Sequence, residues 1–108
     1  MPFANIWERD THFAKHGHEF GAPDATAYER LADAFMYGPA PASTRECLRP
    51  RGIDRIRFDF GSHHEAVECV APAFIRTFFI VRNRIVARHG GSAAYFAWDC
   101  GRVGGVDL

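Results

Sequence analysis

The spacing of the hydrophobic residues changes once along the chain, and this change restricts the fold more than any other feature of the sequence. In the first part, hydrophobic side chains recur at positions i, i+3, i+4, i+7 and i+8, namely Tyr28, Leu31, Ala32, Phe35 and Met36. This spacing is typical of an amphipathic helix with one face on a core. Asp24 can cap that helix, and Gly38-Pro39 should end it. After a segment rich in proline and glycine the spacing becomes two, which is typical of strands.

The strand-like part begins with Ile56, Phe58 and Phe60, which alternate with Arg55, Arg57 and Asp59. We expect a strand with one face on the core and the other in water. Further strands are expected around Val67 and Cys69, over Ala73–Val81, over Arg84–Arg88 and, after a turn at Gly90-Gly91, over Ala93–Trp98. Helices followed by strands predict an α+β fold, in which N-terminal helices pack on a four- to five-stranded antiparallel sheet.

The length of 108 residues fits a single domain, 1–108. We divide it into a helical part at about 6–37, a connection at 38–52 and a sheet at about 53–99. A short first helix is expected over Thr11–His16, capped by Asp10 and ended by Gly17. No hydrophobic run approaches the roughly 18 residues of a membrane span, and no Sec signal peptide pattern opens the chain. We therefore expect neither a membrane partner nor export by the Sec route.

The charges are balanced in total and uneven in distribution. The formal net charge is zero, which does not indicate a strongly basic nucleic-acid binder. Residues 1–44 carry three basic and six acidic side chains, whereas residues 45–88 carry nine arginines and five acidic side chains. Arginine outnumbers lysine twelve to one, and its planar fork suits phosphate oxygens. The second half is thus a candidate for phosphate contacts, although an arginine-rich genome would give the same composition.

The three cysteines, Cys47, Cys69 and Cys100, are an odd number at wide spacing, and no C-x-x-C motif occurs. This pattern disfavours both a disulfide framework and a zinc ribbon. We expect three buried, reduced thiols.

The segment around His12 and His16 has the highest density of side chains that can do chemistry. The two histidines are four residues apart, so they share one face of a helix, and Lys15 lies beside them. An imidazole can accept or donate a proton near neutral pH, and a cation can stabilise an oxyanion or hold a phosphate. The same pattern also fits a merely polar helix surface. A metal site completed by Cys100, His63 or His64 is a weaker alternative, because the H-E-x-x-H glutamate is replaced by Phe13.

A second candidate is the pair Arg76 and Thr77, which interrupts an otherwise apolar strand. Leaving these polar groups buried and unpaired would be costly. Strand parity places them on opposite faces unless a bulge intervenes. Arg76 could also pair with a carboxylate such as Glu19 or Asp59. Tyr95 could supply a hydroxyl or a stacking face, although a core aromatic is the plainer interpretation.

Three blocks in this order resemble one branch of the barnase–EndoU–colicin–RelE superfamily of small ribonucleases. The blocks are His12–Gly21, Tyr28–Ala32 and Ile75–Phe79, and they follow the family pattern H-F-x-K-H-G-x-E-F, Y-x-x-L-A and I-R-T-F-F over roughly residues 11–80. That branch occurs in phage-associated proteins and as toxin domains of contact-dependent and polymorphic toxin systems. The resemblance implies helices on a four-stranded antiparallel sheet.

The resemblance also implies RNA cleavage without a metal or any other cofactor. The ribose 2′-hydroxyl would attack the neighbouring phosphate and leave a 2′,3′-cyclic phosphate. His12 would act as base or acid with His16 as alternative or partner, Lys15 and Arg76 would stabilise the phosphorane, and Thr77 would hold a phosphate oxygen. Arg55 and Arg57 could follow the RNA backbone, with Tyr95 as a further contact.

As a toxin, the protein would act on RNA, including tRNA, in the bacterial cytoplasm, and a cognate immunity protein would be its partner. Two alternatives stand beside this hypothesis. The chain could keep the fold as a non-enzymatic module that binds protein or RNA, or it could be a His/Cys metal-binding domain. In the sequence, zero net charge and an irregular Gly61–Pro72 depart from the family pattern.

Overall fold

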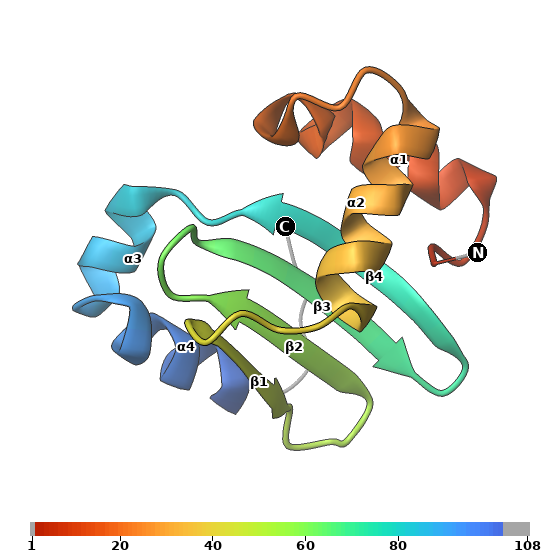
Figure 1. Cartoon of the computed structure of the whole chain (residues 1–108). Coiled ribbons are helices and arrows are strands. Elements are labelled where there is room, and N and C mark those ends of the chain that lie inside the picture. The colour runs from red at the N-terminus through yellow and green to blue at the C-terminus, as the bar shows by residue number, and fades with distance from the viewer. Residues whose placement is uncertain (1, 103–108) are drawn as a thin grey trace.

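The computed structural model describes residues 2–102 and places helices on both faces of one sheet (Figure 1). The elements in chain order are α1 (Ile6–His16), the 3-10 helix η1 (Gly17–Phe20), α2 (Ala25–Tyr37), β1 (Thr44–Leu48), β2 (Asp54–Asp59), β3 (His64–Val70), β4 (Ala73–Ile80), α3 (Asn83–His89) and α4 (Ser92–Gly101). The predicted α+β class is confirmed.

The four strands form an antiparallel meander in the order β1-β2-β3-β4. Neighbouring residues of one strand face opposite sides, so Ala66 joins the core under α1 and α2, whereas Val67 joins the core under α3 and α4. The outer edge of β4 is extended by Phe3, which forms a parallel bridge with Ile75. The sheet is therefore the middle layer of three.

The expected helix after Asp24 is confirmed. The Asp24 side chain accepts a hydrogen bond from the backbone N–H of Ala27 at 2.8 Å, as an N-cap should. Tyr28, Ala32 and Met36 are fully buried, while Leu31, which we expected on the same face, is exposed. The helix thus presents a narrower apolar stripe than the spacing suggested.

The first helix is longer than predicted. It begins at Ile6 with Asn5 as its cap, and not at Thr11 with Asp10 as its cap. Gly17 does not end the helix in a left-handed conformation, because the chain continues directly into η1. The left-handed position is taken by Gly21, with φ of 64°.

Two predicted strands are helices, and the predicted connection contains a strand. Arg84–Arg88 lies in α3 and Ala93–Trp98 lies in α4, so the sheet ends at Ile80 and not near residue 99. The glycine pair is a helix boundary and not a hairpin turn: Gly90, with φ of 99°, ends α3, and Gly91 precedes α4. The segment 38–52 includes β1, which pairs with β2.

The prediction of one wet face for β2 is also wrong, because α2 covers that face. Arg57 is only 8% exposed, and its Nη1 donates to the carbonyl oxygens of Phe35 and Gly38 at 2.8 and 2.7 Å. The last carbonyls of a helix have no partner within the helix. Arg57 therefore joins the end of α2 to the sheet.

A disulfide joins Cys47 in β1 to Cys100 in α4, so the expectation of three reduced thiols is wrong for these two. The packing of α4 beside β1 brings their Cα atoms to 6.1 Å, a normal separation for a disulfide. Cys69 is a free, buried thiol, as expected.

Asp59, at the end of β2, collects several hydrogen bonds. Its side chain accepts from the hydroxyls of Ser43 and Thr44 and from the backbone N–H of Ser62. Burial alone would raise the pKa of this carboxyl group, but the hydrogen bonds outweigh burial and hold the pKa well below its usual range.

We expect Asp59 to make folding sensitive to acid. A carboxylate whose pKa is lower in the folded state stabilises the fold above its unfolded pKa, and this contribution is lost as the pH falls below about 4. In the Asp59→Asn variant, urea unfolding between about pH 4 and pH 2 should depend less on pH, by up to about 1.4 kcal/mol per pH unit. Asp33→Asn, on the exposed face of α2, is the control and should leave the slope unchanged. An unchanged slope for Asp59→Asn would contradict the assignment.

Candidate active site

His12 and His16 lie together in the seam between α1 and the edge strand β4. Their ring centroids are 6.3 Å apart in a stacked arrangement. The His12 ring also stacks on Phe3, and the His16 ring contacts Phe79 of β4. The structure thus brings the two predicted histidines into one row of imidazoles.

Each imidazole has its own carboxylate. The Nε2 atom of His12 is 3.8 Å from an oxygen of Glu8, one helical turn earlier. The Nδ1 atom of His16 is 2.6 Å from one oxygen of Glu19, whose other oxygen accepts a hydrogen bond from the backbone N–H of Ile80 at 2.7 Å. Glu19 therefore ties His16 to the end of β4.

Each imidazole also keeps one nitrogen without a partner among residues 2–102. These buried atoms are Nδ1 of His12 and Nε2 of His16. Burial lowers the pKa of His12, and the nearby charges of His16 and Lys15 lower it further, against the opposing effect of Glu8. His12 is therefore a neutral imidazole at pH 7, which is the form that can accept a proton.

Arg76 faces a surface depression of about 270 Å³ beside this row. The depression is lined by Ala4, Asn5, Glu8, Phe74, Ile75 and Arg76. Glu8, the partner of His12, thus shares it with Arg76. His12 itself does not line this depression, so the predicted convergence of His12 and Arg76 on one phosphate stays a prediction.

A bulge determines the direction of Arg76. Val67 pairs with Thr77 and the next residue, Glu68, pairs with Ile75, so Arg76 is the extra residue of β4. Its Nε donates to Asp54 at 2.7 Å, and not to Glu19 or Asp59 as we considered. The guanidinium is therefore charge-paired at the depression.

Thr77 and Tyr95 are not part of this site. Thr77 is 1% exposed, and its register opposite Val67 places it under α3 and α4. Tyr95 lies in a helix and is also buried, with its hydroxyl donating to Glu65 at 3.0 Å. Burial raises the pKa of Tyr95. Because both side chains are buried, neither can reach a substrate in this structure, and the substrate contacts that we predicted for them are not formed.

The other predicted cations differ in their surroundings. Lys15 is exposed on α1. Arg55 binds Glu46 at 2.6 Å and Glu68 at 2.9 Å, and Arg57 also binds Glu46. Because carboxylates neutralise both arginines of β2, they do not form an open track for RNA. Two residues that our sequence reasoning missed are Glu46 and Glu8; the i, i+4 spacing of Glu8 and His12 is the signal that could have identified the latter.

The side chains considered as further metal ligands are engaged elsewhere. Cys100 is in the disulfide, His63 contacts Asn83 and Ser92, and the His64 ring packs edge-on against Phe20. Within residues 2–102, no group of three or more His, Cys, Asp or Glu side chains is arranged to hold a metal ion.

The chain matches no protein-family model, and a search of curated proteins returns no match. In the described part of the chain, no helix has both the length and the apolar character needed to cross a membrane.

Proposed function

We propose that this protein is a small, metal-independent endoribonuclease of the barnase–EndoU–colicin–RelE type, with His12 as its central catalytic residue. One observation carries the proposal: the half-buried imidazole of His12 lies 3.8 Å from Glu8, and Glu8 lines a surface depression together with Arg76. Transesterification of RNA needs a proton acceptor for the 2′-hydroxyl and positive charge for the phosphorane. His12 and Arg76 supply these two groups.

In this mechanism, Nε2 of His12 removes the proton from the 2′-hydroxyl. The 2′ oxygen forms a bond to phosphorus, the bond from phosphorus to the 5′ oxygen breaks, and the 5′ oxygen takes a proton from the imidazolium or from water. Glu8 stabilises the imidazolium, since its carboxylate lies beside Nε2. Burial, and to a smaller extent the neighbouring His16 that Glu19 fixes, keeps the pKa of His12 low. Arg76 and the exposed Lys15 neutralise the charge on the phosphate.

The resemblance to toxin domains further supports a toxic role in the bacterial cytoplasm, with a cognate immunity protein as inhibitor. Growth arrest on expression in bacteria would support this part of the proposal. Expression without any effect on growth would contradict it.

The decisive experiment incubates the purified protein with total RNA in EDTA and maps the new ends. We expect 2′,3′-cyclic phosphate and 5′-hydroxyl ends. His12→Ala should reduce the cleavage rate by about 100-fold or more, the usual contribution of a general base. The rate of the wild type should rise with pH through a pKa below 6.5 and level off near neutrality, because His12 must be unprotonated.

His18→Ala is the matched control, because His18 is exposed in the neighbouring η1 and should leave the rate unchanged. A second variant, His12→Gln, keeps a polar side chain, so that a loss of cleavage can be distinguished from a failure to fold. Cleavage by both His12 variants at the wild-type rate would refute the site. A folded wild type that cuts no RNA would refute the enzyme and favour the non-enzymatic binding module.

A further inference from the structure

Three arginines at the start and on the outer side of α3 have no carboxylate partner in the part of the chain that the structure describes. Arg82, Arg84 and Arg88 are exposed, and none of them forms an ion pair with any residue in 2–102. By contrast, Arg49, Arg55, Arg57 and Arg76 are all paired with acidic side chains. Three unpaired arginines therefore gather at α3, whereas the arginines of β2 are neutralised by carboxylates.

The sequence keeps this region free of acidic residues. Between Glu68 and Asp99 there is no Asp or Glu, while the same stretch contains Arg76, Arg82, Arg84 and Arg88. Opposing charge would have to come from another part of the chain, and residues 2–102 bring none within ion-pair distance of the α3 arginines. The surface is thus left positive by both sequence and fold.

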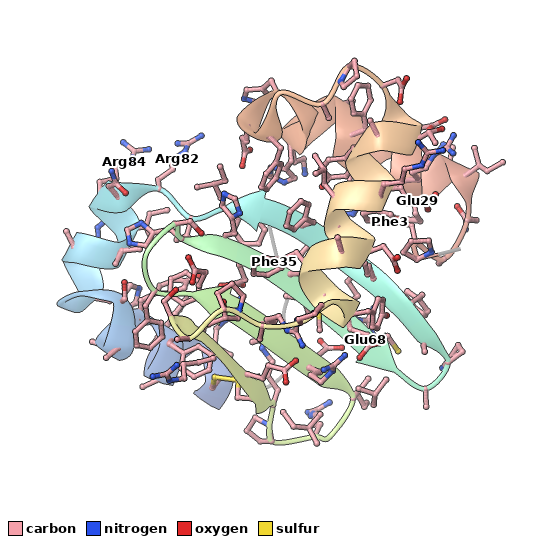
Figure 2. The ribbon with its side chains drawn as sticks, in the orientation of Figure 1. Phe3, Glu29, Phe35, Glu68, Arg82 and Arg84 are labelled. Atoms are coloured by element: carbon pink, nitrogen blue, oxygen red, sulfur yellow. A yellow bond between two sulfur atoms is a disulfide. The ribbon has the colours of Figure 1, made fainter. Side chains whose placement is uncertain are left out.

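The geometry of α3 presents these charges to solvent. Val86 is buried and Ile85 and His89 are half-buried, so they define the inner face. Arg84 and Arg88, four residues apart, share the opposite face. Arg82 precedes the helix, and Figure 2 shows Arg82 and Arg84 projecting away from the sheet at this end of α3.

The arginine surface continues directly from the candidate active site. Glu19, which holds His16, accepts the backbone N–H of Ile80. Arg82 follows Ile80 by two residues, so their Cα atoms are at most about 7 Å apart. A polyanion bound at the imidazole row could therefore extend onto α3 past the carboxylate of Glu19, both of whose oxygens are already bound, to His16 and to the Ile80 amide.

We propose that Arg82, Arg84 and Arg88 form a substrate-binding surface, which holds the phosphates of single-stranded RNA beyond the scissile bond. This inference rests on the proposed ribonuclease function. The exposed Trp98 of α4 packs on His89 of α3, with ring centroids 4.4 Å apart, so an aromatic face lies at the end of α3 that carries Arg88. Arginines next to an exposed aromatic ring suit single-stranded RNA, because its phosphates bind the arginines and its bases stack on the ring.

The test measures binding of the full chain to a fluorescent single-stranded 2′-O-methyl RNA over a series of salt concentrations. This RNA has no free 2′-hydroxyl and cannot be cleaved, so binding is measured whether or not the protein is an active ribonuclease. The double variant Arg84→Gln/Arg88→Gln should lower the slope of log Kd against log salt by about 1.4, since each contact to a single strand contributes roughly 0.7. Affinity at 0.1 M salt should fall by about tenfold or more.

Arg30→Gln/Arg51→Gln is the matched control. It removes two exposed arginines that are also without an ion pair in the described chain, and it changes the net charge by the same amount. Its affinity should stay within about twofold of wild type. Equal losses in both variants would overturn the proposal in favour of a diffuse charge effect. Unchanged RNA binding by the α3 variant would overturn the proposal as well. Polyglutamate serves as a second probe. If the α3 variant lost binding to polyglutamate but kept binding to RNA, the surface would be assigned to an acidic protein and the proposal would be overturned.

Discussion

Replacing Asp99 with alanine should lower the free energy of unfolding by about 3–5 kcal/mol. Asp99 in α4 is fully buried, and its Oδ1 accepts hydrogen bonds from Arg49 at 2.8 Å and from Arg102 at 3.1 Å. Arg49 is itself almost completely buried and also donates to the backbone carbonyl of Asp99. Removal of the carboxylate would take away the closest counter-charge of the buried guanidinium, since the Arg49–Asp54 contact is longer, at 3.5 Å. Urea unfolding of the two proteins measures the loss.

Two variants show whether the loss of stability comes from leaving the buried guanidinium of Arg49 without its carboxylate. Arg49→Met/Asp99→Leu removes both charged groups, and it should recover much of the stability lost in Asp99→Ala, because hydrophobic substitutes for a buried pair are often neutral. Asp10→Ala breaks the exposed pair of Arg9 and Asp10 and should cost less than about 1 kcal/mol. If Asp99→Ala cost no more than Asp10→Ala, the role assigned to the buried pair would be wrong.

Loss of the disulfide should destabilise the protein by about 3–4 kcal/mol. The bond joins residues 53 positions apart, and closing a loop of that size removes much of the entropy of the unfolded chain. For a domain of about 100 residues, this corresponds to a fall in Tm of roughly 15 °C or more. Thermal unfolding of Cys47→Ser/Cys100→Ser, compared with wild type, measures the effect.

Reduction provides the control for the serine substitutions. Wild type in reductant should melt like the double variant, and the variant should not respond to reductant. In denaturant without reductant, the wild type should show one titratable thiol, that of Cys69, and after reduction three. Three thiols before reduction would refute the bond.

The disulfide and the buried ion pair reinforce the same contact. Cys47 and Arg49 lie at the end of β1, and their partners Cys100 and Asp99 are neighbours in α4. Groups that hold one contact together rarely contribute additively. We therefore expect Asp99→Ala to be more damaging in the reduced protein than in the oxidised one.

The helices were predictable from the sequence where a long period and a cap agreed. Asp24 and the residues up to Met36 met both conditions, and α2 was found at its correct start. In α3 the helix is only seven residues long, too short for its spacing to be distinguished from that of a strand. Gly90 after His89 was the neglected signal, since a glycine after a basic last turn is a common helix end.

The burial of the β2 side chains and of Thr77 depends on tertiary packing. The alternation of Arg57 and Asp59 with apolar residues indicated a wet face, but Arg57 is bound at the end of α2 and Asp59 is enclosed by hydrogen bonds from Ser43, Thr44 and Ser62. The pairing of His12 with His16 is local and followed from their spacing. The bulge that turns Arg76 aside, and the burial of Thr77 beneath α3 and α4, are set by β3 and by helices distant in sequence, which local spacing does not encode.

The two edges of the sheet differ in how they are protected against pairing with strands of other molecules, which would lead to fibrils. At β4, the bridge from Phe3 occupies part of the margin. At β1 the outer backbone has no further strand within residues 2–102. That margin is only five residues long, carries Arg45 and Glu46, and lies between Pro41 and Pro50, which have no amide hydrogen to donate. Short, charged, proline-flanked margins recruit foreign strands poorly, so the protein can expose an unpaired strand and remain dispersed.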